Sequence, residues 1–251
     1  MNKKMKKRQE IIDLIVDILE PLDYVKAMWE AGSTSFNRTD EWSDIDLMVI
    51  AEEKEIENVF RKVKKCLMKI SPIDIIYDVP AARAEGFYQK FYRLADISKF
   101  MLIDLAIFPI DAKYKYLERE IHNEPRIYFD KGKFTFCKSI NKKEFNKKLK
   151  EVKEKLKIRT EMFSIFFEKE MKRKNYIEAV DFYYNFALNS LIIALRIIHT
   201  PFHYNFRTKY IHYELPDDII KKLSSLYFIK DEKDLKEKFE KARKWTNKLL
   251  E

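Results

Sequence analysis

Apolar and polar residues alternate in two different ways along this chain, and the change falls near residue 140. Before that point, short apolar runs bounded by Gly, Pro, Asn or Asp predict β-strands at 24–30, 45–51, 73–79, 87–94, 100–108 and 127–129. After it, apolar residues recur three or four apart, which predicts helices at 141–173, 176–199, 216–226 and 231–250. The pattern favours an α+β fold, with a mixed-sheet domain over residues 1–139 and an all-α helical bundle over 140–251.

Helices are also predicted between the strands of the first domain. Residues 8–20 carry apolar side chains at helical spacing and stop before Pro21. Residues 52–70 are acidic at their start and basic at their end, as the helix dipole favours. We expect a short helix or loop over 34–42 and a short helical piece over 114–121.

One stretch of the first domain carries residues suited to phosphate and metal chemistry. Gly32 and Ser33 follow the first predicted strand, and a Gly-Ser pair at such a turn offers backbone N–H groups and a hydroxyl to a phosphate. Asp44 and Asp46 stand two apart where the strand 45–51 opens, so we expect both carboxylates on one face. Like charges on one face need a counter-charge, and Mg²⁺ bound through carboxylates and substrate phosphates is the usual one.

A third carboxylate is expected from a neighbouring strand. Asp104 is the only charged residue in the apolar run 100–108, and a lone buried carboxylate is costly unless it is paired or binds a metal. Asp74 is the competitor, but it lies near the start of its strand, where a turn or capping role is easier. We therefore prefer Asp104.

The spacing of these residues resembles that of the DNA polymerase beta-type nucleotidyltransferase superfamily. In that superfamily a Gly-Ser turn precedes, by about ten residues, an Asp-hydrophobic-Asp strand. The matching residues here are Glu30-Ala31-Gly32-Ser33 and Ser43-Asp44-Ile45-Asp46-Leu47. The resemblance is specific over residues 24–51, and in layout the chain is most similar to the antibiotic (aminoglycoside and lincosamide-type) nucleotidyltransferases.

The resemblance implies roles for the three carboxylates. Asp44 and Asp46 would hold the Mg²⁺ that grips a nucleoside triphosphate, with ATP as the expected substrate. Asp104 would be a third metal ligand, or a base near the acceptor hydroxyl. All three are therefore candidate catalytic and metal-binding residues.

The nucleotide is expected to be held by a second set of residues. By resemblance, Ser33 and the amides around Gly32 would bind its β- and γ-phosphates. Arg38 lies in the loop that follows and is placed to reach a phosphate, although an exposed loop arginine is often simply solvated. Lys209, in the aromatic connector of the second domain, is a further candidate contact for phosphate or base.

Charge is distributed unevenly and bears on the acceptor. Residues 1–139 hold equal numbers of acidic and basic side chains, whereas 140–251 carry the whole net charge of +9. A basic helical half invites polyanions such as RNA, although Lys-rich helix faces with interspersed Glu are also simply solvated. Polycationic aminoglycosides suit a basic partner poorly, so we expect an uncharged or anionic acceptor.

The remaining features limit the location of the protein. No apolar run approaches the roughly 18–20 residues that span a bilayer. The basic N-terminus precedes an apolar stretch interrupted by Asp13 and Asp17, unlike a signal peptide. With only Cys66 and Cys137, a disulfide framework is not expected. We predict a cytoplasmic monomer or homodimer with no membrane partner.

The sequence thus predicts an enzyme that transfers a nucleoside monophosphate, AMP from ATP, to a hydroxyl of a small molecule and releases pyrophosphate. Two alternatives stay open. One is transfer to RNA or protein, which the basic second half favours. The other is a non-catalytic nucleotide-binding module, which three retained carboxylates disfavour.

Overall fold

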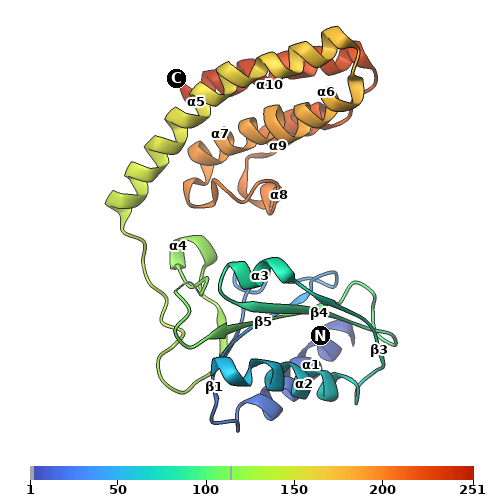
Figure 1. Cartoon of the computed structure of the whole chain (residues 1–251), viewed down its shortest axis with the longest axis vertical. Helices are drawn as coiled ribbons and strands as arrows, with labels where there is room; N and C mark the ends of the chain where they lie inside the picture. Colours follow the sequence, from blue (N-terminus) through green and yellow to red (C-terminus); the bar gives the residue numbers. More distant parts are fainter. Residues whose placement is uncertain (1–2, 114) are drawn as a thin grey trace. The chain divides into compact units, whose positions relative to one another are not determined.

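The computed structural model describes residues 3–113 and 115–251 (Figure 1). The chain divides into two compact units, residues 1–140 and 141–251. The first holds a six-stranded mixed sheet with flanking helices and the second is helical, so the predicted α+β fold is confirmed. In the described part of the chain, no helix combines the length and apolarity needed to cross a membrane.

The sheet of the first unit has the strand order β3-β4-β5-β2-β1-β6. Neighbouring strands are antiparallel except β2 and β5, which are parallel and lie at the centre. The strands are β1 (Val25–Glu30), β2 (Ile45–Ala51), β3 (Ile73–Asp78), β4 (Tyr88–Leu94), β5 (Ile103–Pro109) and β6 (Arg126–Asp130). All six predicted strands are present, and the bounds of β2 are those predicted.

The two faces of the central strands bury different sets of side chains. One face packs on helices α1 (Lys3–Leu19) and α2 (Ile56–Leu67), which lie together on one side of the sheet (Figure 1). Alternate residues of β2 and β5 fill this core, because side chains of a strand point to opposite faces in turn. They are Ile45, Leu47, Val49, Ile103, Leu105 and Ile107.

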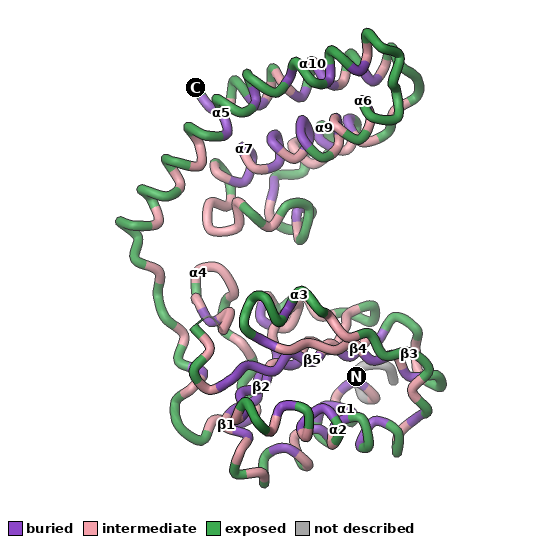
Figure 2. The backbone as a smooth tube through the Cα atoms, viewed as in Figure 1, coloured by how far each residue is buried: buried purple, intermediate pink, exposed green. Residues whose placement is uncertain are grey.

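The opposite face of the sheet carries a smaller apolar cluster, and polar residues lie on this face near the start of β2 and β5. Trp29 and Phe108, both buried, stack with ring centroids 6.0 Å apart. Helix α3 (Pro80–Ala84) contributes Ala82, and the segment after β5 contributes Leu117. The central strands are buried along most of their length (Figure 2). Asp46 and Asp104 belong to this second face by the same alternation.

Several predicted elements differ in extent. Helix α1 begins at Lys3, earlier than predicted, and 52–70 splits into a 3₁₀ turn, Glu53–Glu55, and α2. The piece predicted over 114–121 is helical only at α4 (Arg119–His122), and its first residue, Tyr114, lies outside the described residues. Hydrogen-bonded turns, rather than a helix, occupy most of 34–42. Helix α3 was not predicted, because its five residues are too few to show apolar residues recurring at helical spacing.

The second unit is built around two long helices. Helix α5 (Lys142–Arg173) begins where the Asn141 side chain accepts hydrogen bonds from two backbone N–H groups, and it ends at Lys174 in the left-handed conformation. Phe167 of α5 stacks on Phe239 of α10 (Glu232–Leu250) with ring centroids 3.7 Å apart. The other elements are α6 (Tyr176–Phe182), a π-helical segment (Tyr183–Leu188), α7 (Asn189–His199), a 3₁₀ turn (Pro201–His203), α8 (Ile211–Glu214) and α9 (Asp217–Tyr227).

Asp130, the last residue of β6, organises the loop that follows it. Burial disfavours its ionised form, but the Thr135 hydroxyl and the backbone N–H groups of Thr135, Phe134 and Gly132 outweigh that effect and lower the pKa of Asp130. A lowered pKa means that the stabilisation is present at neutral pH and is lost as the pH falls below about 4. We expect Asp130→Asn to unfold more easily at pH 7 but to lose less stability than wild type between pH 5 and pH 3, measured by urea denaturation at each pH. Parallel pH curves for the two proteins would contradict this assignment.

Candidate functional site

Asp46 and Asp104 are neighbours across the centre of the sheet. They are register partners in the parallel pair of β2 and β5, so both side chains stand on the same face. Each is the second residue of its strand and is half-buried. On this face, the apolar cluster around Trp29 and Phe108 occupies the later residues of both strands. The structure therefore brings together two of the three predicted carboxylates from separate parts of the chain.

Gly32 lies directly against one of these carboxylates. Its φ is +60°, a conformation that favours glycine, and a Cβ at this position would lie 1.8 Å from Oδ2 of Asp46. The backbone N–H of Ala31 also donates to the carbonyl of Asp46 over 3.0 Å. The predicted phosphate turn and the predicted metal carboxylate thus meet at one place, because β1 and β2 pair side by side.

Replacing Gly32 and, as a control, Gly86 by alanine distinguishes the effect of backbone strain from that of a steric clash with Asp46. We expect Gly32→Ala to lower the predicted transfer activity about a hundredfold, because the new methyl group must displace the Asp46 carboxylate or the turn. Gly86→Ala is the matched control: Gly86 has a φ of +88°, but nothing lies within 4 Å of its added Cβ. The control should lose about 1 kcal/mol of stability and keep its activity. Equal activities of the two variants, measured as kcat/KM for ATP, would argue against this geometry.

The loop after Gly32 folds back on itself and brings Arg38 beside Ser33. The Arg38 backbone N–H donates to the Ser33 carbonyl over 2.9 Å, and the Arg38 guanidinium lies 5.1 Å from the centre of the Phe36 ring. The Ser33 hydroxyl makes no hydrogen bond to the described residues. A hydroxyl and a guanidinium are therefore adjacent to the turn that we predicted to bind phosphate.

A buried charge network fixes both ends of this loop. Arg8 of α1 pairs with Glu30, the last residue of β1, and both side chains are almost fully buried. Glu30 also accepts hydrogen bonds from Thr34, at the start of the loop, over 2.7 Å and from Tyr128 of β6 over 2.7 Å. Arg8 donates to the backbone carbonyl of Asp44, at the end of the loop, over 3.1 Å.

Asp44 is held by its backbone at the entrance to β2. Besides the hydrogen bond from Arg8, a turn closes just before it, where the Asp40 carboxylate accepts from the Trp42 backbone N–H and the Ser43 hydroxyl, both over 2.9 Å. Asp44 lies two residues before Asp46, immediately outside the strand. Its predicted role as a metal ligand remains a prediction.

Gln89 is a site residue that the sequence analysis did not identify. Its side-chain amide donates to both carboxylate oxygens of Asp104, over 2.7 and 2.8 Å. Gln89 lies on β4 opposite Ala106, on the face that carries Asp104. These two hydrogen bonds fix the orientation of the Asp104 carboxylate.

The donor set at the site suits Mg²⁺ better than a softer metal. Among the described residues, no group of three or more His, Cys, Asp or Glu side chains is placed to hold a metal ion. Mg²⁺ is commonly bound by one or two carboxylates together with substrate phosphates, so Asp46 and Asp104 would supply enough protein ligands. The Asp46 carboxylate occupies the space that a side chain at residue 32 would need, so glycine at this position is what permits the arrangement.

Two further candidates belong to other elements of the chain. Asp74 is on β3, two strands away from β5, and its carboxylate pairs with Arg93 on the surface through three hydrogen bonds of 2.7 to 3.1 Å. That partner explains the carboxylate without a metal and supports the choice of Asp104. Lys209 belongs to the second unit, where it is exposed and its backbone carbonyl accepts a hydrogen bond from Arg196.

Neither a protein-family model nor a curated protein matches the sequence. Among solved structures, an aminoglycoside 6-adenyltransferase from Bacillus subtilis is similar with a TM-score of 0.35 and 14% identity, over 97% of this chain and 91% of that one. A STING-associated CdnE c-di-GMP synthase from Capnocytophaga granulosa gives a TM-score of 0.33 and 16% identity, over 99% and 81%. Both of these proteins are members of the nucleotidyltransferase superfamily. With TM-scores below 0.5, these similarities carry no weight for the activity of this chain, which has to be judged from its own side chains.

Proposed function

We propose that the protein is a Mg²⁺-dependent nucleotidyltransferase that transfers AMP from ATP to a hydroxyl of a small-molecule acceptor. One observation carries the proposal: Asp46 and Asp104 face the same way from paired strands, with the Gly32 turn packed against Asp46. Carboxylates placed beside a phosphate-binding turn are what a metal-bound triphosphate requires.

The residues of the chain divide the work between binding and orientation. The backbone of the Gly32 turn, the Ser33 hydroxyl and the Arg38 guanidinium bind the triphosphate oxygens. Bound Mg²⁺ would be held by Asp46 and Asp104 and would stabilise negative charge on the phosphates. Asp104, whose two carboxylate oxygens accept hydrogen bonds from Gln89, would be a metal ligand or the base that takes the proton of the acceptor hydroxyl. The acceptor hydroxyl gives up its proton to Asp104 or to solvent, and its oxygen forms a bond to the α-phosphorus as the bond to pyrophosphate breaks.

The charge of the chain favours an acceptor without positive charge. Residues 140–251 carry the whole net charge of +9, and a polycation would be repelled if it approached that unit. Transfer to RNA or protein is the second candidate, and this same basic half is the observation that favours it.

Labelled transfer tests the proposal directly. The protein is incubated with Mg²⁺ and ATP labelled at the α-phosphate, together with separate pools of small hydroxyl compounds, bulk tRNA and cell protein. We expect label in the small-molecule pool and release of pyrophosphate. Label in tRNA or protein would support the second candidate. Binding of ATP without pyrophosphate release in any pool would favour a non-catalytic nucleotide-binding module.

A further inference from the structure

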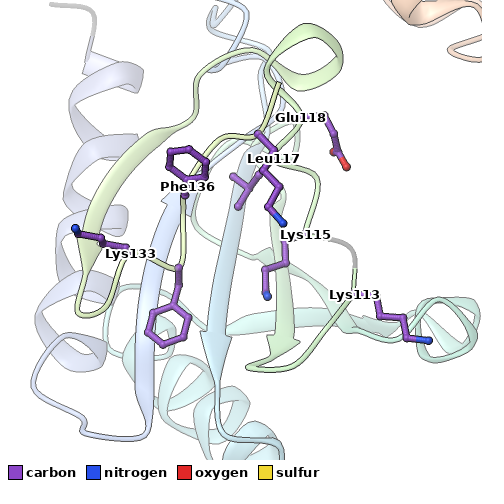
Figure 3. A pocket seen from close by; sticks show the side chains of 8 residues that line it. Lys113, Lys115, Leu117, Glu118, Lys133 and Phe136 are labelled. Atoms are coloured by element: carbon purple, nitrogen blue, oxygen red, sulfur yellow. The ribbon is translucent and has the colours of Figure 1, made fainter. Parts of the chain in front are cut away.

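A basic pocket of about 280 Å³ lies in the first unit, away from the carboxylates. Four lysines line it, Lys113, Lys115, Lys133 and Lys138, around the side chain of Leu117. Figure 3 shows Lys115 in the middle of the pocket, with Lys133 and Lys113 toward opposite sides. Its volume is near the lower end of the range for small-molecule sites, about 300–1,000 Å³.

The positive charge of this pocket is not balanced by the protein. None of the four lysines forms an ion pair or side-chain hydrogen bond with the described residues. Glu118 is the one acidic residue of the lining, and it already faces His122, with Oε2 and Nε2 3.7 Å apart. Like charges around a concave surface attract a counter-ion. The first unit as a whole has no net charge, so this is a local excess.

In another pocket of the chain, the lysines of the lining are matched by an equal number of acidic residues. A cavity of about 330 Å³ in the second unit is lined by Lys172 and Lys236, but also by Glu168 and Glu240. Acidic and basic groups are equal in number there, whereas lysines outnumber acids four to one in the basic pocket. The general abundance of lysine therefore does not by itself produce the excess.

The walls of the basic pocket are held by backbone structure. Lys133 lies in the loop that the Asp130 carboxylate fixes through four hydrogen bonds. Lys138 is tied to Glu118 by an isolated parallel bridge, and its carbonyl accepts from the Arg119 backbone N–H over 3.1 Å. Two of the four ammonium groups therefore project from a preformed frame, which reduces the cost of ordering them around a ligand.

The pocket is separate from the candidate catalytic site. Asp104 is at the start of β5, whereas Lys113 and Lys115 follow its far end at Pro109. Lys133 follows the C-terminal end of β6, where Asp130 pairs with Ala27. The Gly32 turn follows Glu30, which pairs with the opposite end of β6. A ligand here would therefore not compete for the metal carboxylates.

An aromatic side chain beside the lysines narrows the class of ligand. Phe136 lines the pocket and is 71% exposed, whereas Leu117 is buried at its base. An exposed ring suits stacking with a planar or apolar group. We propose that this pocket binds a small phosphate monoester, with its doubly charged phosphate between the lysines and its organic part against Phe136.

AMP in metal-free buffer is the probe, and calorimetry is the measurement. Without added metal, the candidate catalytic site lacks one of the groups proposed to hold a phosphate, so its own binding of AMP is weakened. We expect one AMP to bind per chain, with an affinity that weakens as salt is raised. The double variant Lys115→Gln/Lys133→Gln should weaken binding at least tenfold, and Lys115→Arg should bind like wild type. Phe136→Ala should weaken AMP binding more than it weakens binding of inorganic phosphate.

The matched control is Lys172→Gln/Lys236→Gln, which removes two lysines from the charge-balanced cavity and should leave AMP binding unchanged. Asp46→Asn should also leave it unchanged, whether or not the proposed transfer activity exists. Three results would overturn the proposal: no saturable AMP binding, equal weakening in the control pair, or loss of binding in Asp46→Asn. Binding of a long RNA with no binding of AMP would also overturn it.

Discussion

Asp46→Asn is expected to lower kcat/KM for nucleotidyl transfer about a thousandfold or more while the protein stays folded. Asparagine keeps the size of aspartate but removes the charge next to the Gly32 turn. Groups that stabilise charge in a dry, preorganised site commonly contribute factors of about 10² to 10³ each, and a metal ligand contributes at least as much. Rates are measured by pyrophosphate release with ATP and the acceptor found by labelling. Circular dichroism and thermal unfolding check the fold.

Asp74→Asn is the matched control for this change. Asp74 is also an aspartate within a strand of the same sheet, but it lies two strands from β5 and pairs with Arg93 on the surface. Removing an exposed ion pair costs about 0–1 kcal/mol of stability, so this variant should transfer AMP at the wild-type rate. If Asp46→Asn kept full activity, or if both variants lost it equally, the assignment of Asp46 to the metal would be wrong.

Much of the architecture follows from local patterns of the sequence. Apolar runs with turn residues at both ends located all six strands. Burial accounts for the apolar residues of the central strands, whereas the edge strand β3 is largely exposed. The long helix α5 was predicted from its apolar spacing and begins at the Asn141 cap. The order of the strands in the sheet was not predictable in this way. Pairing between strands that are distant in sequence depends on tertiary contacts, which leave no periodic pattern in the local sequence.

The π-helical segment shows where periodicity fails. A single helix was predicted over 176–199, but the structure has a π turn at Tyr183–Leu188 between α6 and α7. Within it, the hydroxyls of consecutive Tyr183 and Tyr184 donate to the carbonyls of Leu226 and Tyr227 at the end of α9. Tertiary hydrogen bonds of this kind accompany the wider turn, and they join residues 43 apart in sequence.

The candidate site was predictable only in part, for a related reason. Gly32 and Asp46 are found from a motif that is continuous in sequence. Gln89 is fifteen residues from Asp104 and reaches it only because β4 and β5 pair in a particular register. Arg8 is twenty-two residues from Glu30 and lies in a helix whose polar residues look like an ordinary solvated face. Supporting residues of a site carry little sequence signal because their role depends on the finished fold.

The buried pair of Arg8 and Glu30 is the supporting feature with the largest expected effect on stability. We expect Glu30→Gln and Arg8→Met each to lower the free energy of unfolding of the first unit by about 3–5 kcal/mol, since each leaves its partner charge buried without compensation. The double variant should lose less than the sum of the two single changes, because no uncompensated charge remains. Urea denaturation followed by tryptophan fluorescence measures the change, in a Trp245→Phe background so that the signal comes from Trp29 and Trp42 of the first unit.

The same variants report on the loop that carries Ser33 and Arg38. Because the pair holds Thr34 at one end of that loop and the carbonyl of Asp44 at the other, Glu30→Gln should raise KM for ATP and lower kcat together, at temperatures where the protein is still folded. Glu10→Gln is the matched control, since the ion pair that Glu10 forms among the described side chains is an exposed one with Lys7 at 3.8 Å. A Glu30→Gln protein as stable and as active as Glu10→Gln would show that the buried network supports neither the fold nor the loop.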